Sequence, residues 1–204
     1  MRIIEQSYEI LKFSETPEQD IELSARTCYK SEDKIIDDSA NDLVRKLVNR
    51  NHLAMIEFGD ATVKFITDRG VTHEFVRHRL CSLAQESTRY VNYKSGAEFI
   101  LPVFWDKWTA VQQSIWKESM SNSEYFYKSL IERGASPQEA RSVLPNSLKT
   151  ELVVKANLRE WMHIFSLRCS KAAHPQIREL LLPLLDEFCE RCPVVFEGIR
   201  ENLN

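Results

Sequence analysis

A long helical segment constrains the fold of this chain more than any other feature of its sequence. Helix-forming residues run from Asp106 to Arg133, and Gly134 follows them as a helix C-cap residue. The serine-rich run from Ser119 to Ser123 lies inside this segment and is a candidate for a break in the helix. The sequence therefore predicts a helix-rich fold whose longest helix lies in this region.

Shorter helices and a few strands are predicted on either side of this segment. The apolar run from Arg2 to Leu11 is typical of an edge strand, and the alternation from Ala61 to Ile66 indicates a half-buried strand. Residues 89–93 are rich in strand-forming side chains, and residues 152–156 fit a strand or a buried helix equally well. Further helices are expected from Pro17 to Tyr29 with Thr16 and Gln19 as a capping box, from Ser39 with Leu43 and Leu47 on one face, from Val71 to Leu80 with Phe75 and Val76 inward, after Ser136 in a second capping box, and from Pro175 to Cys192.

The fold class follows from these elements and from the scarcity of chain-breaking residues. The 204 residues include only five glycines and seven prolines, with no repeat and no Gly/Ser-rich linker. We therefore expect a single α+β domain over residues 1–204, in which helices flank a twisted, mostly antiparallel β-sheet. Neither GxGxxG nor GxxxxGK[ST] is present, which disfavours the Rossmann and P-loop folds.

Charge and cysteine content exclude several classes of protein. A net charge of -3 gives no general basic field, so nucleic acid is not an expected partner. The N-terminal residues lack the apolar stretch of a signal peptide, and no segment is apolar enough to span a bilayer, so we expect a cytoplasmic protein without a membrane partner. The five cysteines are then expected as reduced thiols, and Cys189 and Cys192 lack the further ligands that a zinc site needs.

The residues most suggestive of chemistry lie between Arg77 and Tyr90. Arg77, His78 and Arg79 are three consecutive basic or protonatable side chains, which in the simplest interpretation are a solvated helix end. Successive helical side chains rotate by about 100°, so these three would fan across roughly 200° and could not all meet one small anion. Either the helix ends here, or the three groups serve different surfaces. Arginine pairs well with phosphate, and serine and glutamine can bond the edge of a pyrimidine, so this segment is a plausible nucleotide-binding set.

This segment resembles the signature of the flavin-dependent thymidylate synthases. The run Arg77-His78-Arg79, seven residues and then Ser87 matches their RHR-x7-S motif, and Arg89-Tyr90 follows as in that family. The resemblance covers about residues 20 to 195. Further elements similar to the family pattern are Ala25-Arg26, Ala140-Arg141-Ser142-Val143-Leu144-Pro145, Asn157-Leu158-Arg159 and Ser166-Leu167-Arg168.

The resemblance implies an activity, its cofactors and a set of site residues. Members of the family convert dUMP to dTMP with FAD, NADPH and methylenetetrahydrofolate, and they form homotetramers in which several subunits build each active site. Ser87 is expected as a hydrogen-bond partner near the reacting pyrimidine carbons, since a serine nucleophile needs a neighbouring base that spacing does not reveal here. Arg168 is the second expected catalytic residue. The flavin would be bound by Arg77, His78, Arg79, Asn157 and His163, and dUMP by Glu74, Arg77, Gln85, Ser87, Thr88, Arg89, Arg141 and Arg168.

Several positions depart from the common family pattern and leave alternatives open. Phe58 stands where many members have histidine, Ala84 where asparagine is frequent, and Gln85 where glutamate is frequent. His163 stands where some members place an asparagine against the flavin. These departures leave room for a related flavin enzyme that transfers another one-carbon group or uses another pyrimidine nucleotide. A third possibility is a non-catalytic module that binds a nucleotide or single-stranded RNA. No metal is expected, and His52, His73 and His174 are expected at surfaces or helix ends, because they lack partners at metal-ligand spacing.

Overall fold

The computed structural model describes residues 1–203 and divides the chain into two compact units. The first unit comprises residues 1–7, 65–77 and 83–153, and the second comprises residues 8–64, residues 78–82 and the chain from Val154 onwards. The expectation of one domain over residues 1–204 stays a prediction, and each unit is described by itself below.

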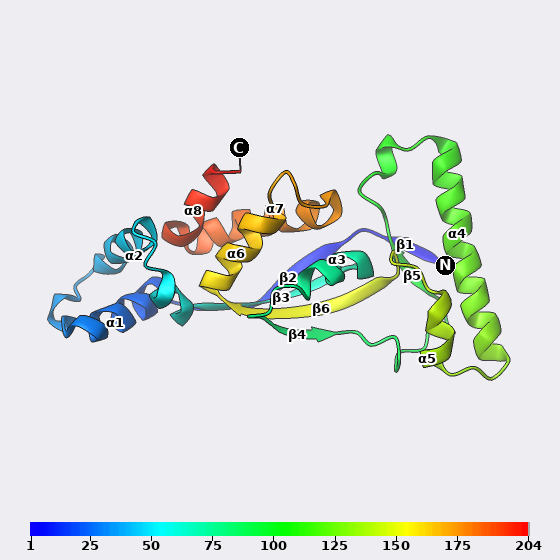
Figure 1. Cartoon of the computed structure of the whole chain (residues 1–204), viewed down its shortest axis with the longest axis horizontal. Coiled ribbons are helices and arrows are strands. Elements are labelled where there is room, and N and C mark those ends of the chain that lie inside the picture. Colours follow the sequence, from blue (N-terminus) through cyan, green and yellow to red (C-terminus); the bar gives the residue numbers. More distant parts are fainter. Residues whose placement is uncertain (204) are drawn as a thin grey trace. The chain divides into compact units, whose positions relative to one another are not determined.

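Both helices and strands are distributed along the chain, which confirms the predicted α+β class (Figure 1). The strands are β1 Arg2–Ile4, β2 Ser7–Phe13, β3 Asp60–Asp68, β4 Ser82–Gln85, β5 Glu98–Ile100 and β6 Lys149–Asn157. The helices are α1 Pro17–Tyr29, α2 Ser39–Asn49, α3 Arg69–Phe75, α4 Ala110–Glu132, α5 Pro137–Ala140, α6 Leu158–Arg168, α7 Pro175–Arg191 and α8 Pro193–Glu201. Short 3-10 helices lie at η1 Glu32–Lys34, η2 Leu53–Phe58, η3 Trp105–Lys107 and η4 Arg141–Val143.

The strands form one sheet of four strands and one pair. The four-stranded sheet has the order β2-β3-β6-β4 and is antiparallel, as expected. The pair β1–β5 is parallel, with Arg2 opposite Glu98. Among the helices of residues 1–203, none combines the length and apolar character that a membrane span requires.

Alternating burial explains why β3 and β6 are strands. Ala61, Val63 and Phe65 are fully buried, while the residues between them are half-buried. Leu152 and Val154 are buried in the same alternating way in β6. Successive side chains of a strand point to opposite faces, so this pattern suits a sheet with one face in the core. Residues 152–156, which the sequence left undecided, therefore belong to a strand.

The first unit packs around α4, which Figure 1 shows in green as one uninterrupted helix. Its side chains Met120 and Tyr127 are buried in a core cluster that also contains Phe99 of β5. The predicted break at residues 119–123 is wrong. The Ser123 hydroxyl donates to the Ser119 carbonyl oxygen at 3.0 Å, which satisfies the polar group within the helix, and the buried Met120 holds this turn against the core.

The second unit has an aromatic core between its helices and β2. Trp161 and Phe165 of α6 pack with Phe188 of α7, with ring centroids 5.0 to 5.6 Å apart. Phe13 of β2 and Phe196 of α8 meet the Phe188 ring edge-on at 5.0 and 5.2 Å. Aromatic pairs of this geometry add to the stabilisation from burying apolar surface. This core holds α6, which carries several of the predicted site residues.

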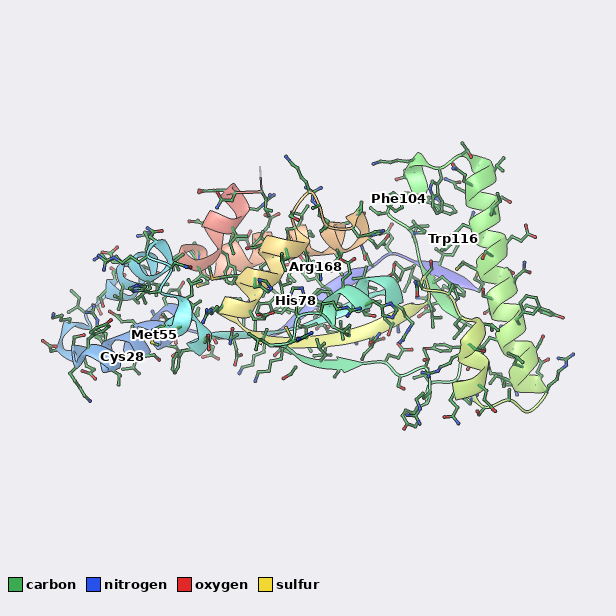
Figure 2. All side chains as sticks on the ribbon, in the orientation of Figure 1. Cys28, Met55, His78, Phe104, Trp116 and Arg168 are labelled. Carbon is green, nitrogen blue, oxygen red and sulfur yellow. The ribbon has the colours of Figure 1, made fainter. Side chains whose placement is uncertain are left out.

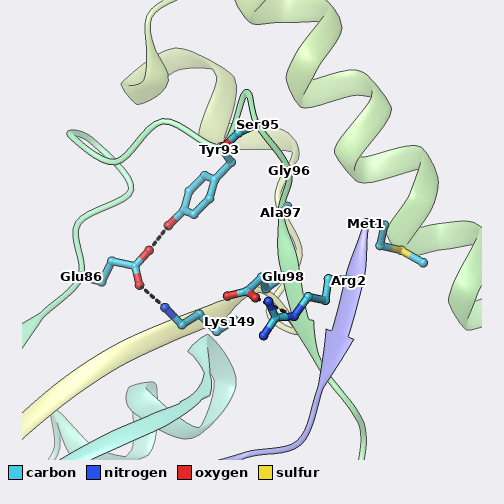
Figure 3. A pocket seen from close by; sticks show the side chains of 9 residues that line it. All are labelled: Met1, Arg2, Glu86, Tyr93, Ser95, Gly96, Ala97, Glu98 and Lys149. Carbon is cyan, nitrogen blue, oxygen red and sulfur yellow. Dashed lines mark hydrogen bonds and ion pairs between the residues drawn. The ribbon is translucent and has the colours of Figure 1, made fainter.

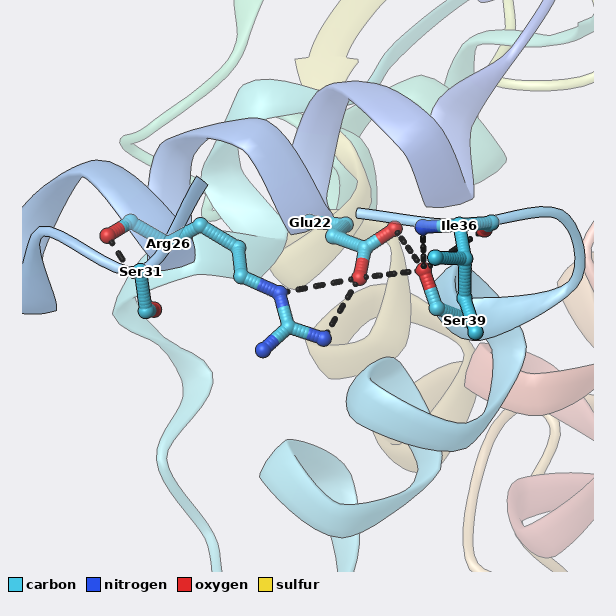
Figure 4. Close-up of polar contacts among 5 residues, drawn as sticks. All are labelled: Glu22, Arg26, Ser31, Ile36 and Ser39. Atoms are coloured by element: carbon cyan, nitrogen blue, oxygen red, sulfur yellow. Dashed lines mark hydrogen bonds and ion pairs between the residues drawn. The ribbon is translucent and has the colours of Figure 1, made fainter. Parts of the chain in front are cut away.

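A buried carboxylate connects α1 with the start of α2 (Figure 4). Glu22 is 2% exposed, and it accepts hydrogen bonds from Arg26 Nε and Nη2 and from the Ser39 hydroxyl. A buried charge is tolerated when it is paired and hydrogen-bonded in this way. Arg26, which belongs to the early Ala-Arg element of the sequence, therefore has a structural contact within α1.

Several local predictions are wrong at helix ends and in one loop. Thr16 occupies the N-cap position of α1, but its ψ of 60° departs from extended geometry and its side chain makes no capping bond. Val76 is 45% exposed because α3 ends at Phe75. Residues 89–93 are not extended, since the amides of Tyr90 and Val91 both donate to the Ser87 carbonyl and form a turn. The helix predicted from Ser39 is present as α2, in which Leu43 and Leu47 lie one turn apart and are half-buried, and Ala40 and Val44 are buried.

Candidate functional site

The RHR motif lies immediately beyond the end of α3. The Asp68 side chain begins this helix by accepting from the Val71 amide at 2.7 Å, and the Arg77 amide donates to the Glu74 carbonyl just after its last turn. Because the helix ends before the motif, the three side chains need not fan around a helix axis. Arg77 and Arg79 are exposed, whereas His78 between them is 3% exposed. The motif therefore presents two cations to solvent and directs one imidazole into the protein.

His78 is surrounded by polar side chains of α6. Its Nε2 accepts a hydrogen bond from Arg168 Nε at 3.1 Å, and Figure 2 shows these two side chains close together. Its Nδ1 lies 3.3 Å from Glu160 Oε1, although the N–H direction is not aligned for a hydrogen bond. The ring of His163 meets the His78 ring edge-on, with centroids 5.5 Å apart. Both ring nitrogens of His78 thus face protein groups.

The protonation state of His78 follows from these contacts. Its pKa is lowered from 6.5 to about 4, chiefly by burial and, in the same direction, by the positive charge of Arg168 and by the neighbouring His163. His78 is therefore neutral near pH 7. Arginine has no acceptor, so Nε2 must offer its lone pair to Arg168 and the single ring proton resides on Nδ1.

Three contacts fix the helix that carries this cluster. Asn157 caps α6, with its side-chain oxygen accepting from the Glu160 amide at 2.9 Å. Trp161 Nε1 donates to the Ala61 carbonyl of β3 at 3.1 Å. Gly59 lies so close to Leu158 that a Cβ there would be 2.6 Å from Leu158 Cδ1. The first turn of α6 is therefore held firmly against β3 within the second unit.

Glu160 is a residue of this cluster that sequence reasoning missed. It is 6% exposed, and burial raises the pKa of its carboxyl, although His163 acts in the opposite direction. The spacing Asn157-x-x-Glu160 matches a helix-start pattern in which the glutamate would bond back to the cap residue. In the structure the carboxylate faces His78 instead. Both sequence signals, this spacing and an acidic residue in the first turn, indicate a helix start and not a contact with His78.

The same cluster is a possible metal-ligand set. Ligand atoms of His78, Glu160 and His163 lie within 4.8 Å of one another, the one such group found among the described residues. However, the guanidinium of Arg168 is bonded to His78, so a cation here would lie beside a fixed positive charge. The expectation of no metal stays a prediction.

The predicted nucleotide residues of the first unit lie along β4 and the turn that follows it. Buried Thr88 accepts a hydrogen bond from Arg141 Nη1 at 3.3 Å, so the structure brings together two residues 53 positions apart. The Ser87 hydroxyl accepts from the Arg89 amide at 3.3 Å. Arg89 is exposed, and its guanidinium lies 5.4 Å above the Tyr90 ring. Two guanidinium groups thus accompany two hydroxyl groups, a set suited to an anionic ligand.

Gln85 and Glu74 complete the predicted nucleotide residues of this unit. The Gln85 amide nitrogen donates to the Thr72 hydroxyl at 2.9 Å and lies 3.4 Å from the Thr150 hydroxyl. This side chain therefore joins β4 to α3 and β6. Glu74 is half-buried on α3, three residues before the motif.

A cavity of about 340 Å³ lies next to this segment (Figure 3). The Tyr93 hydroxyl donates to Glu86 at 2.6 Å, and Lys149 Nζ lies 3.1 Å from Glu86 and 2.7 Å from Glu151. Burial raises the pKa of Tyr93, and the Glu86 carboxylate raises it further. The pKa of Lys149 is also raised, because its two carboxylate partners outweigh the effect of burial. These contacts of Glu86 with Tyr93 and Lys149 were not predicted. They fix the position of Glu86, which lies between the predicted site residues Gln85 and Ser87.

The predicted site residues divide between the two units. His78, Arg79, Asn157, His163 and Arg168 belong to the second unit, and the remaining predicted residues belong to the first. The expected catalytic pair Ser87 and Arg168 is therefore divided between the units. The departures Phe58 and Ala84 are exposed, and His52, His73 and His174 are exposed as expected. The five cysteines are free thiols.

Comparison with known proteins identifies the family. The family model described as "Thymidylate synthase complementing protein" matches residues 9–194. A flavin-dependent thymidylate synthase of Geobacter sulfurreducens is 29% identical over 196 residues, covering 92% of this chain and 84% of the relative. One of Pyrococcus abyssi is 30% identical over 194 residues, covering 89% and 78%. The chain belongs to the flavin-dependent thymidylate synthase family, which confirms the predicted enzyme class, a methyltransferase.

A solved structure has the same fold. The UMP/dUMP methylase PolB of Streptomyces cacaoi, bound with 5-Br dUMP, aligns with a TM-score of 0.85 and 22% identity, covering 98% of this chain and 97% of PolB.

The residues of the second unit fit the flavin that the family name implies. Exposed Arg79 offers a guanidinium that can pair with a phosphate, and the cluster around His78 offers two imidazole rings and the guanidinium of Arg168.

Proposed function

We propose that this protein catalyses the reductive methylation of dUMP to dTMP, with methylenetetrahydrofolate as carbon donor, reduced FAD as hydride source and NADPH as the reductant of the flavin. The observation that carries the proposal is the family match over residues 9–194, within which the RHR-x7-S motif is intact from Arg77 to Ser87. The exposed arginines of this motif and the polar cluster around His78 support it.

On the flavin side, the residues act through position and charge. FAD, when bound, supplies the hydride chemistry. Arg77 and Arg79 would pair with its phosphates, because both guanidinium groups are exposed. Asn157 and His163 would face the flavin, with Asn157 also committed to capping α6. His78 directs both ring nitrogens to protein groups, so its ring face or edge is the part left to contact a flavin.

On the nucleotide side, the cationic residues would grip dUMP and stabilise charge. Arg89 and the Thr88–Arg141 pair would bind the phosphate, and Gln85 and Glu74 would line the same pocket. Arg168 would stabilise negative charge that develops on the uracil, an electrostatic effect commonly worth several kcal/mol. Ser87 would act as a hydrogen-bond partner and not as a nucleophile, since its hydroxyl accepts from a backbone amide and no base is paired with it in the contacts described for residues 1–203.

The proposal includes a homotetramer in the cytoplasm. Exposed apolar side chains of α4 support self-association, because Val111, Ile115, Tyr125 and Phe126 are each more than half exposed. An apolar face of this kind commonly marks an interaction surface.

A related activity on another pyrimidine nucleotide is the second candidate. The departures at Phe58, Ala84, Gln85 and His163 favour it, and the fold neighbour is described as acting on UMP as well as dUMP. The binding-module alternative has less support, since the net charge is -3.

The test is the visible absorption spectrum of the purified protein, followed by titration with dUMP and, separately, with UMP. A flavin spectrum that shifts with dUMP, and a dTMP product identified by mass in the presence of methylenetetrahydrofolate and NADPH, are expected. A product of another mass, or turnover of UMP alone, would favour the related activity. A colourless protein that does not take up added FAD would rule out the flavin mechanism.

A variant sharpens this test at the nucleotide phosphate. Arg89→Ala is expected to raise the KM for dUMP about 10- to 100-fold, since a hydrogen bond to a charged group is commonly worth about 1.5–3 kcal/mol. The matched control is Arg133→Ala, an exposed arginine of the same unit at the end of α4. Equal KM values for Arg89→Ala and the control would remove Arg89 from the site.

A further inference from the structure

Glu160 lies outside the RHR-x7-S motif, yet it is the acidic group that faces the histidine of that motif. It is 6% exposed and stands in the first turn of α6, three residues before His163 on the same helix face. Its Oε1 is 3.3 Å from His78 Nδ1. The burial of this carboxylate has to be explained, because removing its charge from water costs free energy unless a hydrogen-bond or charged partner compensates.

The contacts of His78 explain why a carboxylate is buried at this position. Its Nε2 accepts from Arg168 Nε at 3.1 Å, so the imidazole must be the tautomer with its proton on Nδ1. That proton is on the nitrogen that lies 3.3 Å from Glu160 Oε1, and a small rotation of either side chain would align the two for a hydrogen bond. A carboxylate next to one ring nitrogen is a common device for holding a histidine in one tautomer and orientation.

We propose that Glu160 is a positioning residue, whose carboxylate holds His78 in the Nδ1–H tautomer so that Nε2 fixes the orientation of the Arg168 guanidinium. The consequence for catalysis rests on the proposed function, in which Arg168 stabilises charge on the uracil. All three residues belong to the second unit. Glu160 touches neither ligand in this scheme and acts through His78.

The other groups near His78 do not replace Glu160 in this role. His163 and Arg168 lower the affinity of His78 for a second proton, and neither has a carboxylate to accept from Nδ1. The Cys81 thiol follows on the same short segment, and burial raises its pKa to about 12, so it stays protonated. Glu160 is therefore the anionic partner of the ring in this cluster.

The test observes the tautomer directly and does not depend on turnover. Histidine labelled with ¹⁵N in the ring is incorporated into the protein as purified, and the His78 signals are assigned by their loss in His78→Gln. At pH 7 we expect wild-type His78 to carry its proton on Nδ1, and we expect Glu160→Gln to show a mixture of tautomers. Glu190→Gln, an exposed glutamate on α7 of the same unit, is the matched control and should leave the spectrum unchanged.

The same variants are then assayed with dUMP. Glu160→Gln is expected to lower kcat about 10- to 100-fold, the usual range when a carboxylate that orients a functional histidine is removed. The KM for dUMP should change less, because a misoriented Arg168 loses charge stabilisation mainly in the transition state. Glu190→Gln should turn over dUMP like the wild type.

Three results would overturn the proposal. They are a wild-type His78 protonated on Nε2, a Glu160→Gln variant with unchanged tautomer, and a variant with a changed tautomer but normal kcat. If Glu160→Gln does not fold, Glu160→Met takes its place, because it also removes the carboxylate at similar side-chain volume, and an unchanged tautomer and kcat in that variant would count equally against Glu160. A wild type that never turns over dUMP would refute the proposed function, while the nuclear magnetic resonance comparison would still decide whether Glu160 holds the tautomer.

Discussion

The burial of His78 should make the stability of this protein depend on pH in a way that one substitution can reveal. The pKa of His78 is lowered from 6.5 to about 4, first by burial and then by Arg168 and His163. Between about pH 4 and pH 6.5, His78 is protonated in the unfolded chain but neutral in the folded protein. The free energy of unfolding is therefore unaffected by protonation of His78 above about pH 6.5, and it decreases as the pH falls from 6.5 toward 4.

The magnitude follows from the two pKa values. At pH 5 the unfolded histidine is almost fully protonated and the folded one is mostly neutral, which costs the native state about 2 kcal/mol relative to pH 7. Glu160 acts in the opposite sense, because a carboxyl with a raised pKa binds its proton first in the folded state. The comparison of wild type with His78→Gln isolates the histidine contribution from the rest of the chain.

The assay is urea denaturation of both proteins at pH 7 and pH 5, at one protein concentration. His78→Gln is expected to be less stable than wild type at pH 7, and the gap should narrow by about 2 kcal/mol at pH 5. His52→Gln, at an exposed position, serves as the control and should keep the wild-type pH dependence. A gap between His78→Gln and wild type that stays constant at the two pH values would refute the argument.

Three further changes test the packing and capping around the two groups of site residues. Asn157→Ala removes the cap of α6 and should cost about 0.5–2 kcal/mol of unfolding free energy in urea, with Asn157→Ser recovering most of the loss; no loss would contradict the capping bond. Trp161→Ala empties a fully buried site and should cost about 3–5 kcal/mol by the same measurement, and a loss below about 1 kcal/mol would contradict the core assignment. For Glu124 burial alone would raise the pKa, but hydrogen bonds from the N-terminal ammonium, the Ala97 amide and Lys128 lower it to about 2. Glu124→Gln should therefore lose about 3 kcal/mol at pH 7, a loss that shrinks as pH falls from 4.5 toward 2, and a pH-independent loss would contradict the ion pairing.

The sequence predicted the elements whose signals are local. The alternation in β3, the capping box at Ser136 and the length of α4 all depend on neighbours along the chain. Predictions failed where a distant contact decides the outcome. The run from Ser119 to Ser123 has weak helix formers, yet it stays helical because Met120 is buried in the core of the first unit.

In the candidate site, too, some features could be predicted from the sequence and others depend on the folded structure. The order and spacing of Arg77, His78, Arg79 and Ser87 alone pointed to the family, because a motif is a property of the linear chain. The end of α3 at Phe75, which frees the motif from helical geometry, was one of two alternatives that the sequence left open.

The sequence by itself determined the α+β class, the long helix, the motif and the chemical types of the site residues. Only the tertiary structure decided that His78 is buried and neutral, that Arg168 donates to it, and that Glu160 faces it. These residues are separated by up to 90 positions in the chain, and no local pattern encodes which of them meet. Their pKa values and tautomers depend on burial and on charges a few ångströms away, and those quantities exist only once the chain has folded.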